Sequence, residues 1–351
     1  MPEPVSPSAS PSRASFGRGR LLRAAGALLV LLAVAGYVVV QYLSGGGGAP
    51  RCVARAGDDA GEGSSTYEMT PEQAANAATI SAVGTRRGLP ERAVTIALAT
   101  ALQESALRNL DHGDRDSVGL FQQRPSKGWG TVAQIQDPVY SAGEFYDHLV
   151  KVPGYSRLPL TEAAQRVQRS GFPQAYAKHE PDATLLAAAL TGRSAASLTC
   201  SAPSGGTPGD PAKVRAALTR DFGAEVRPAD AAHEVSVPVP AGADAGTGGE
   251  RGASVAGQAG GSDGSGGSGD SRDSGGSGGS GGSVDASTAS PRGWELAHWA
   301  VAQSSALRID KVTYAGRVWR AGRADQGWQR ADGSADSRTS GADVVRIRTA
   351  R

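Results

Sequence analysis

A glycine- and serine-rich stretch limits where this chain can form a folded core. Residues 239–291 are mostly Gly, Ser, Ala and Asp, and they include a GGSGGS run. Such a composition buries too little apolar surface to offset the entropy of ordering the backbone. We interpret 201–291 as a linker that is largely disordered, and a coil as long as 239–291 has an end-to-end distance on the order of 40 Å. Folded sequence is therefore expected in residues 67–200 and 292–351.

An uncharged apolar stretch predicts a membrane anchor near the N-terminus. Residues 24–43 carry no charge and are almost wholly apolar, and a helix of this length would span about 30 Å, the thickness of a bilayer core. Arginines outnumber acidic residues before it, so we expect 1–20 to be a disordered cytoplasmic tail and the chain after 43 to be extracytoplasmic. The alternative is a cleaved signal peptide, whose apolar region is usually about 7–15 residues long. We favour a single-pass, uncleaved signal-anchor in residues 21–43.

The two cysteines, Cys52 and Cys200, bracket the larger segment that is expected to fold. In an extracytoplasmic protein such a pair predicts a disulfide, and for a loop of this size the chain-entropy estimate is about 4–5 kcal/mol. Zinc ligation is a poorer interpretation, because neither cysteine has a CxxC partner or a histidine at ligand spacing. We expect no metal and no cofactor, and the net charge of +2 argues against a nucleic-acid partner.

Residues 67–200 have the pattern of a mainly α domain. Thr70-Pro71-Glu72-Gln73 combines an N-cap, a proline at the first helical position and a capping-box glutamine. Cap signals and apolar spacing predict helices over 71–87, 90–109, 138–149, 161–167 and 181–190. We find no convincing alternating strand pattern between 67 and 200, apart from a short strand or extended piece expected near 118–123, and we expect residues 53–66 to be loose.

Residues 292–351 predict a small α+β unit, and 210–222 predict one amphipathic helix before the linker. The unit is expected to contain a helix over 293–307, a hairpin over 311–320 and a strand over 344–348. It is basic and carries Trp294, Trp299, Trp319 and Trp328. A basic, aromatic module after a spacer suits contact with anionic polymers. Core packing is the alternative, and we favour it for Trp294 and Trp299.

The helix expected over 90–109 places a carboxyl group beside small apolar side chains. Ala93, Ala97, Ala101 and Glu104 share one face of that helix. Partial desolvation there would raise the pKa of the Glu104 carboxyl, as a general acid near neutral pH requires. The alternative from spacing alone is a solvated glutamate at a helix end.

The motif around Glu104 resembles that of the lysozyme-like superfamily, which includes the lytic transglycosylases and goose-type lysozymes. Glu104-Ser105 is followed by Gly119-Leu120-Phe121-Gln122, and the match extends over roughly residues 67–200. The resemblance implies a lysozyme-like helical domain with Glu104 as the catalytic residue and a substrate-binding role for Ser105, Gly119, Leu120, Phe121 and Gln122. It is closest to a membrane-anchored variant of actinobacterial and phage wall-lytic proteins.

One departure from the family concerns its Ala-Tyr-Asn-Ala-Gly stretch. This chain has TLLAAALTG at 184–192 instead. Residues 167–170 and 172–176 resemble the actinobacterial variant, in which Tyr176 would stand in for the missing tyrosine at the substrate site.

The resemblance implies cleavage of peptidoglycan glycan strands at the MurNAc–GlcNAc bond. Glycosidases normally use two carboxyl groups, whereas lytic transglycosylases use one glutamate to protonate the glycosidic oxygen and then deprotonate the C6 hydroxyl, which closes an anhydro ring. Asp111, Asp114 and Asp116 are candidates for a second carboxyl in a hydrolase, or they form turns. The alternative function is a catalytically inactive wall-binding or scaffold protein. A transporter is disfavoured, because one apolar span offers no pathway.

Overall fold

The chain has a mixed α/β structure. The computed structural model describes residues 31–32, 34–35, 49–57, 65–170, 174–201, 207–224, 226–231, 233–239, 289–331 and 341–351. Its helices are α2 (Pro71–Arg86), α3 (Glu91–Ser105), α4 (Val132–Ile135), α5 (Pro138–Leu149), α6 (Leu160–Gln168), α7 (Glu180–Leu190), α8 (Pro211–Phe222), α9 (Pro291–Ala302) and α10 (Ser304–Leu307), with 3-10 turns η1 (Pro125–Lys127), η2 (Ala177–His179) and η4 (Ala321–Gln326). Its strands are β1 (Cys52–Arg55), β2 (Thr66–Met69), β3 (Leu198–Cys200), β4 (Ala229–Ala231), β5 (Glu234–Pro238), β6 (Ile309–Tyr314), β7 (Arg317–Arg320), β8 (Gln329–Arg330) and β9 (Val344–Thr349).

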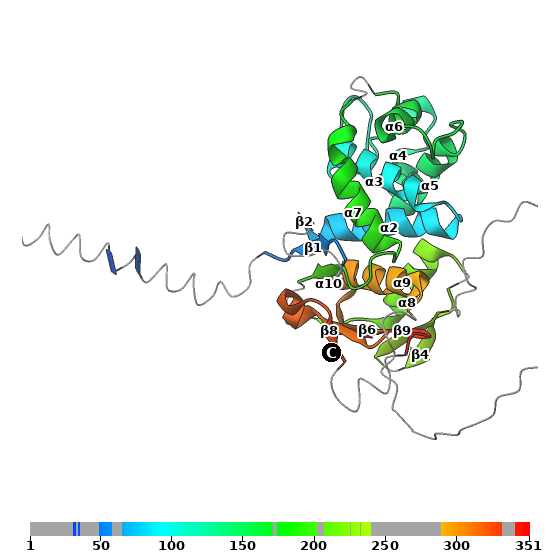
Figure 1. Ribbon diagram of the computed structural model, residues 1–351. Coiled ribbons are helices and arrows are strands. Elements are labelled where there is room, and N and C mark those ends of the chain that lie inside the picture. Colours follow the sequence, from blue (N-terminus) through cyan, green and yellow to red (C-terminus); the bar gives the residue numbers. More distant parts are fainter. Residues whose placement is uncertain are drawn as a thin grey trace, which may run out of the picture. The chain divides into compact units, whose positions relative to one another are not determined.

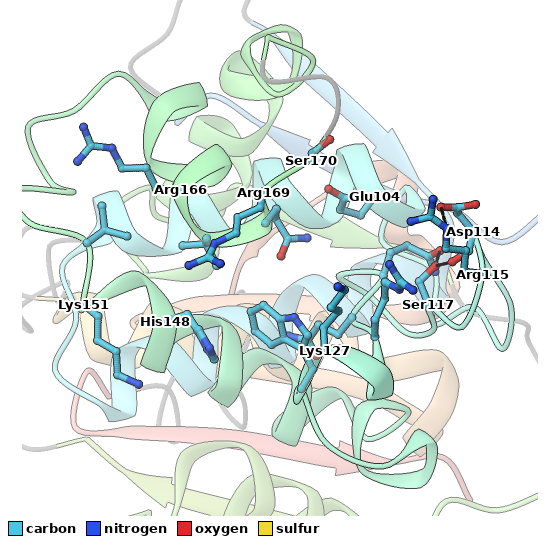
Figure 2. A pocket seen from close by; sticks show the side chains of 17 residues that line it. Glu104, Asp114, Arg115, Ser117, Lys127, His148, Lys151, Arg166, Arg169 and Ser170 are labelled. Carbon is cyan, nitrogen blue, oxygen red and sulfur yellow. Dashed lines mark hydrogen bonds and ion pairs between the residues drawn. The ribbon is translucent and has the colours of Figure 1, made fainter.

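The helices start where the sequence places their caps. The Thr70 hydroxyl accepts from the backbone N–H of Gln73, and the Gln73 side chain accepts from the backbone N–H of Thr70, which confirms the predicted capping box. The Asp137 carboxylate accepts from the backbone N–H of Val139 at the start of α5, and the Asp210 carboxylate accepts from that of Ala212 at the start of α8. Helices α3, α5 and α6 line the cleft that Figure 2 shows.

Helix α3 ends four residues before the predicted position. Ala106 and Leu107 both have positive φ, 52° and 60°, so the chain leaves the helix immediately after Ser105. The Leu107 side chain turns into the core, and its carbonyl oxygen accepts from the side-chain amide of Asn76 on α2. Tertiary packing therefore ends this helix, although no glycine is present at its C-terminus.

A small antiparallel sheet lies beside these helices, in the order β2-β1-β3. Strands β2 and β3 were not predicted, and the expectation that residues 53–66 are loose was wrong for 53–55 and 66, which belong to β1 and β2. Each of these strands has only three or four residues, too few for a clear alternation. β1 and β3 also come from opposite ends of the segment between the cysteines, with Cys52 opposite Cys200. The pattern of neighbouring residues in the sequence does not reveal such a long-range contact. The extended piece expected near 118–123 is present as a bridge between Val118 and Gln123.

The second sheet is antiparallel with the order β4-β5-β9-β6-β7-β8. The predicted hairpin is present as β6 and β7, and the predicted strand over 344–348 is β9. Strand β5 pairs with β9 from Glu234 to Pro238. The helix predicted over 210–222 is present as α8, whereas β4 and β5 fold within the range that was expected to be a linker. Residues 240–288 lie outside the described part of the chain.

Helix α9 lies between the helices of residues 67–200, the helical layer, and the six-stranded sheet, the C-terminal layer. It packs against α2, α7 and β3 and also against β6 and β9, as Figure 1 shows. Residues Pro50–Arg351 accordingly form one compact unit. The C-terminal α+β elements share a core with the helices of 67–200 and do not form a separate module.

The four C-terminal tryptophans belong to this core. Trp294, Trp299, Trp319 and Trp328 are all at most 6% exposed. Trp294 packs edge-on against Tyr314 and Trp328. Core packing, which we favoured for Trp294 and Trp299, therefore holds for all four, and they offer no aromatic surface to a wall polymer.

Buried polar groups join α9 to the helical layer. The Asp221 carboxylate, with no exposed surface, accepts from the Thr79 hydroxyl of α2 at 2.9 Å and from the Trp299 indole of α9 at 2.9 Å, and it pairs with Arg220 at 2.8 Å. His298 donates from Nδ1 to the carbonyl of Ala189 and accepts at Nε2 from a backbone N–H. Burial lowers the pKa of His298 to about 4, so it is neutral in this role.

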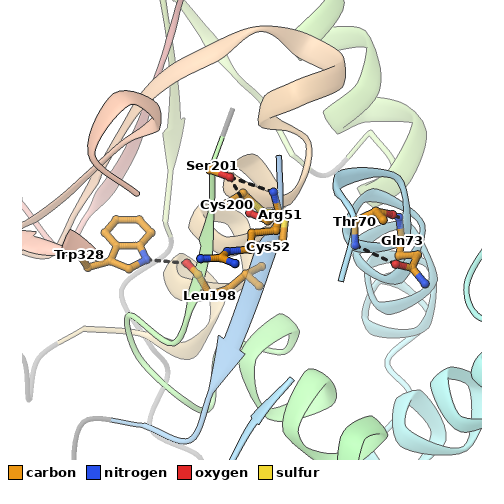
Figure 3. Close-up of a disulfide and its surroundings, with 8 residues drawn as sticks. All are labelled: Arg51, Cys52, Thr70, Gln73, Leu198, Cys200, Ser201 and Trp328. Carbon is orange, nitrogen blue, oxygen red and sulfur yellow. Dashed lines mark hydrogen bonds between the residues drawn. A yellow bond between two sulfur atoms is a disulfide. The ribbon is translucent and has the colours of Figure 1, made fainter. Parts of the chain in front are cut away.

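The predicted disulfide between Cys52 and Cys200 is present. It joins the directly opposed residues of β1 and β3, and the backbone N–H of Arg51 donates to the Ser201 hydroxyl next to it (Figure 3). The Trp328 indole donates to the carbonyl of Leu198 on β3 at 2.9 Å. The disulfide region thus also holds the C-terminal layer.

The expected membrane anchor falls almost entirely outside the described residues, which include only Leu31, Leu32, Val34 and Ala35 of it. Within the described part of the chain, no helix is both long enough and apolar enough to cross a bilayer.

Asp221→Ala should destabilise the whole unit, because it leaves the donors of Thr79 and Trp299 unsatisfied in the core. We expect a loss of about 3 kcal/mol or more in the free energy of unfolding, measured by urea denaturation. Asp147→Ala is the control, since its pair with Arg87 is exposed and should contribute less than about 1 kcal/mol. Equal effects of the two substitutions would contradict this account.

Candidate active site

Glu104 lies in the last turn of α3, where the helix opens into the cleft. Every residue from Ala93 to Leu102 is buried, so the helix is surrounded by other elements and not only along the predicted alanine stripe. Burial is the largest cause of a raised pKa for the Glu104 carboxyl, which confirms the direction expected from the sequence. The C-terminal end of a helix dipole also disfavours a negative charge there.

The Tyr176 hydroxyl donates a hydrogen bond to Glu104 Oε1 at 2.7 Å. Tyr176 is buried, and burial together with the neighbouring carboxylate raises the pKa of its phenol. Hydrogen bonding from Tyr176 and Gln168 partly opposes the effect of burial on the pKa of Glu104. The carboxyl is therefore held in one orientation by a donor that stays protonated.

The predicted motif Gly119-Leu120-Phe121-Gln122 forms a tight loop closed by a bridge between Val118 and Gln123. The Ser105 hydroxyl donates to the Leu120 carbonyl at 2.8 Å, which ties the loop to the residue after Glu104. Gly119 has φ +81°, and a Cβ atom there would lie 2.8 Å from the carbonyl oxygen of Ile135. Glycine is thus required both by the backbone conformation and by the neighbouring chain.

Leu120 and Phe121 anchor this loop in the core. Both side chains have no exposed surface, and the Phe121 ring stacks on Phe145 of α5 with centroids 4.7 Å apart. The Phe121 carbonyl accepts from the Gln168 side chain at 2.7 Å. Four of the predicted substrate-binding residues do not line the cleft, namely Ser105, Gly119, Leu120 and Phe121. They support the cleft wall through packing and hydrogen bonds.

Gln122 is the residue of the motif whose side chain faces the cleft. Its φ of 47° is unusual for a non-glycine residue. Its side-chain oxygen accepts from the Ser117 hydroxyl at 3.0 Å, and its amide nitrogen donates to the Gly119 carbonyl at 3.3 Å. The strained backbone of Gln122 and these hydrogen bonds together fix its side-chain amide at the cleft wall.

The cleft has a volume of about 1040 Å³, and Figure 2 shows Glu104 between two groups of charged side chains. Arg166, Arg169 and Lys151 lie on one side of it in this view, and Asp114 and Arg115 lie on the other. Among the described residues that line the cleft, the carboxyl groups are Glu104 and Asp114, whereas six side chains are cationic. These cations are Arg115, Arg124, Lys127, Lys151, Arg166 and Arg169.

The three loop aspartates differ in their surroundings. Asp116 binds Arg124 at 2.7 Å and the backbone N–H of Ser126 at 2.8 Å, and these hydrogen bonds hold its pKa far below the usual range. Asp111 is exposed and pairs with the neighbouring His112. Asp114 lines the cleft and is 88% exposed. Asp116 thus joins its own segment to residues 124–126, and Asp114 is the loop carboxylate at the cleft.

No metal site was expected from the sequence. Within the described residues, no group of three or more His, Cys, Asp or Glu side chains could hold an ion. Among the described residues, the His179 ring contacts the side chain of Gln103 and belongs to no such group.

The sequence did not single out several cleft residues. Gln168 joins Glu104 to the Phe121 carbonyl from the end of α6. Trp129 stacks on His148 at 4.2 Å between centroids, and both line the cleft with the cations. The one signal for Gln168 was its place in the 167–170 stretch that resembled a family variant; the cations come from separate elements and share no local pattern.

Comparison with known families gives a match outside this site. A family described as VldE, C-terminal domain, matches residues 252–340, which among the described residues include α9, α10 and β6 to β8 but not the cleft. The match covers less than half of the chain. No curated protein matches the chain.

Tyr176→Phe should raise the pKa of Glu104 further. The substitution removes a hydrogen bond that stabilises the carboxylate, so protonation becomes easier at a given pH. The carboxyl ¹³C chemical shift of Glu104, followed through a pH titration, measures this change. Tyr155→Phe, outside the cleft lining, is the control and should leave the titration unchanged. A pKa that falls or stays constant in Tyr176→Phe would contradict this role.

Proposed function

We propose that this chain is an extracytoplasmic enzyme that cleaves the glycan strands of peptidoglycan, with Glu104 as its acid and base. The observation that carries the proposal is a half-buried carboxyl in a large cleft, with its pKa raised by burial and its orientation fixed by Tyr176. A carboxyl with these properties remains partly protonated at a pH where exposed carboxyls are ionised.

The resemblance to the lysozyme-like superfamily supports the reaction class. Glu104-Ser105 and the Gly119–Gln122 loop are the motifs that carry it, and the Ser105 hydrogen bond to the Leu120 carbonyl brings the two together. Tyr176, expected to stand in for the family's missing tyrosine, contacts the carboxyl itself. We therefore favour a lytic transglycosylase over an inactive scaffold of the same fold.

The proposed reaction needs one carboxyl in two protonation states. Protonated Glu104 gives its proton to the glycosidic oxygen as the bond to the anomeric carbon breaks, and the GlcNAc half leaves as an alcohol. Charge then develops on the sugar ring, and the carboxylate of Glu104 takes the proton from the C6 hydroxyl, whose oxygen bonds to the anomeric carbon. The 1,6-anhydro ring forms and Glu104 regains its proton, so the atoms balance without water.

The neighbours of Glu104 suit both steps. Tyr176 stabilises the carboxylate formed in the first step, because it donates to Oε1. Gln122 and Gln168 place side-chain amides at the cleft, where they can hydrogen-bond a sugar without gaining or losing a proton. Asp114 is a candidate base for water, and its use would make the enzyme a hydrolase.

The proposed extracytoplasmic location is supported by a disulfide, and the proposed membrane attachment by the sequence alone. The Cys52–Cys200 disulfide fits an oxidising, extracytoplasmic compartment. Attachment to the membrane through residues 21–43 remains a prediction from the sequence.

Glu104→Gln should abolish clearing in a peptidoglycan zymogram. The amide keeps the size and an acceptor for Tyr176 but cannot donate the acid proton, so we expect a loss of at least about a hundredfold in rate. Glu68→Gln, on the exposed strand β2, should clear like the wild type. No clearing by the wild type, or equal clearing by Glu104→Gln, would leave the inactive scaffold as the better description.

A further inference from the structure

The cleft carries more positive charge than the chemistry at Glu104 requires. Three of its cations have acidic partners: Arg115 lies 3.9 Å from Asp114, Arg124 pairs with Asp116, and Arg166 pairs with Glu162. The remaining cations are Lys127, Lys151 and Arg169. Within the described part of the chain, none of these three has an acidic group at ion-pair distance, and all three are exposed to the cleft.

The unpaired cations come from three elements that frame the site. Lys127 ends the 3-10 turn η1, Lys151 follows α5, and Arg169 ends α6 in a left-handed conformation with φ 52°. Such a φ is unfavourable for arginine, and the residues on both sides of Arg169, Gln168 and Ser170, also line the cleft. Figure 2 shows Arg169 and Lys151 on the side of Glu104 away from Asp114, and Lys127 below Glu104 in this view. We refer to these three unpaired cations together as the arm.

An uncharged sugar chain would gain nothing from such an arm. Hydroxyl and acetamido groups are bound by hydrogen-bonding amides and aromatic faces, and the cleft supplies these in Gln122, Gln168 and the Trp129–His148 pair. Uncompensated cations in a concave, partly enclosed site raise the local concentration of anions and strengthen their binding. The observed charge therefore indicates a ligand that carries negative groups.

We propose that the arm formed by Lys127, Lys151 and Arg169 binds anionic substituents on the glycan strand, so that the enzyme selects charged strands over neutral ones. This inference rests on the proposed function, because it takes the strand as the occupant of the cleft. The negative groups are carboxylates of attached peptides or phosphates of attached polymers, which share the chemistry that lysine and arginine recognise.

The test compares binding by a triple variant, Lys127→Gln with Lys151→Gln and Arg169→Gln, and by a matched control, Lys178→Gln with Lys213→Gln and Arg157→Gln. The control removes two lysines and one arginine that are exposed outside the cleft lining. Both are made in the full chain with Glu104→Gln, so that strands are not cut. Fluorescence anisotropy measures Kd for three labelled soluble strands. The first carries its peptides, the second has the peptides removed and the freed lactyl carboxyls amidated so that it is neutral, and the third is an amidated strand with phosphate polymer attached.

We expect the Glu104→Gln parent and the control to bind charged strands about tenfold or more tightly than the neutral, amidated strands, from three exposed charge contacts. The triple variant should lose this preference, and added salt should reduce it in the parent. A preference for peptide-bearing strands identifies carboxylates, and one confined to polymer-bearing strands identifies phosphates. Equal binding of all strands, or a triple variant that behaves like the control, overturns the proposal.

Failure of the proposed function gives a different result. If the wild type binds charged strands but cleaves none, the proposed role of the arm stands and the proposed enzymatic function is wrong. In an active wild-type background, the triple variant should raise KM for charged strands about tenfold and leave kcat nearly unchanged, since the cations act in binding.

Discussion

The packing of α3 is the constraint on which the rest of the structure depends. Alanines on α3 and α7 allow the two helices to lie against each other, and every residue from Ala93 to Leu102 is buried. A helix enclosed in this way cannot shift its last turn independently. Glu104 is therefore held at the cleft wall with its carboxyl partly removed from water, while Tyr176 offsets part of that cost. We propose that the balance of the two effects lets one carboxyl serve in both protonation states.

The C-terminal elements support this arrangement from the opposite side. Asp221 and His298 connect α2, α7 and α9 through buried hydrogen bonds, and the Trp328 indole reaches the strand that carries Cys200. The helices that position Glu104 thus share a core with the six-stranded sheet. The aromatic residues of 292–351 serve that shared core, whereas the unpaired cations Lys127, Lys151 and Arg169 line the cleft.

Local signals in the sequence predicted most of the helices, because caps such as Thr70 and Asp137 act within one turn. The strands β1 and β3 could not be predicted, since they are short and pair across a separation of 148 residues at the disulfide. Burial of Glu104 followed from its helix, but its contact with Tyr176 depends on how η2 packs against α3. The family resemblance pointed to Tyr176, whereas the convergence of Lys127, Lys151 and Arg169 depends on the tertiary fold alone.

The structure of the reaction product tests most directly whether one carboxyl carries the proton chemistry. Mass spectrometry of muropeptides released from purified peptidoglycan by the full chain distinguishes ring closure from hydrolysis. Our account predicts fragments that end in a 1,6-anhydro ring and are therefore lighter by one water than hydrolytic fragments. Fragments with free reducing ends would contradict it, because they require an activated water and hence a second base such as Asp114.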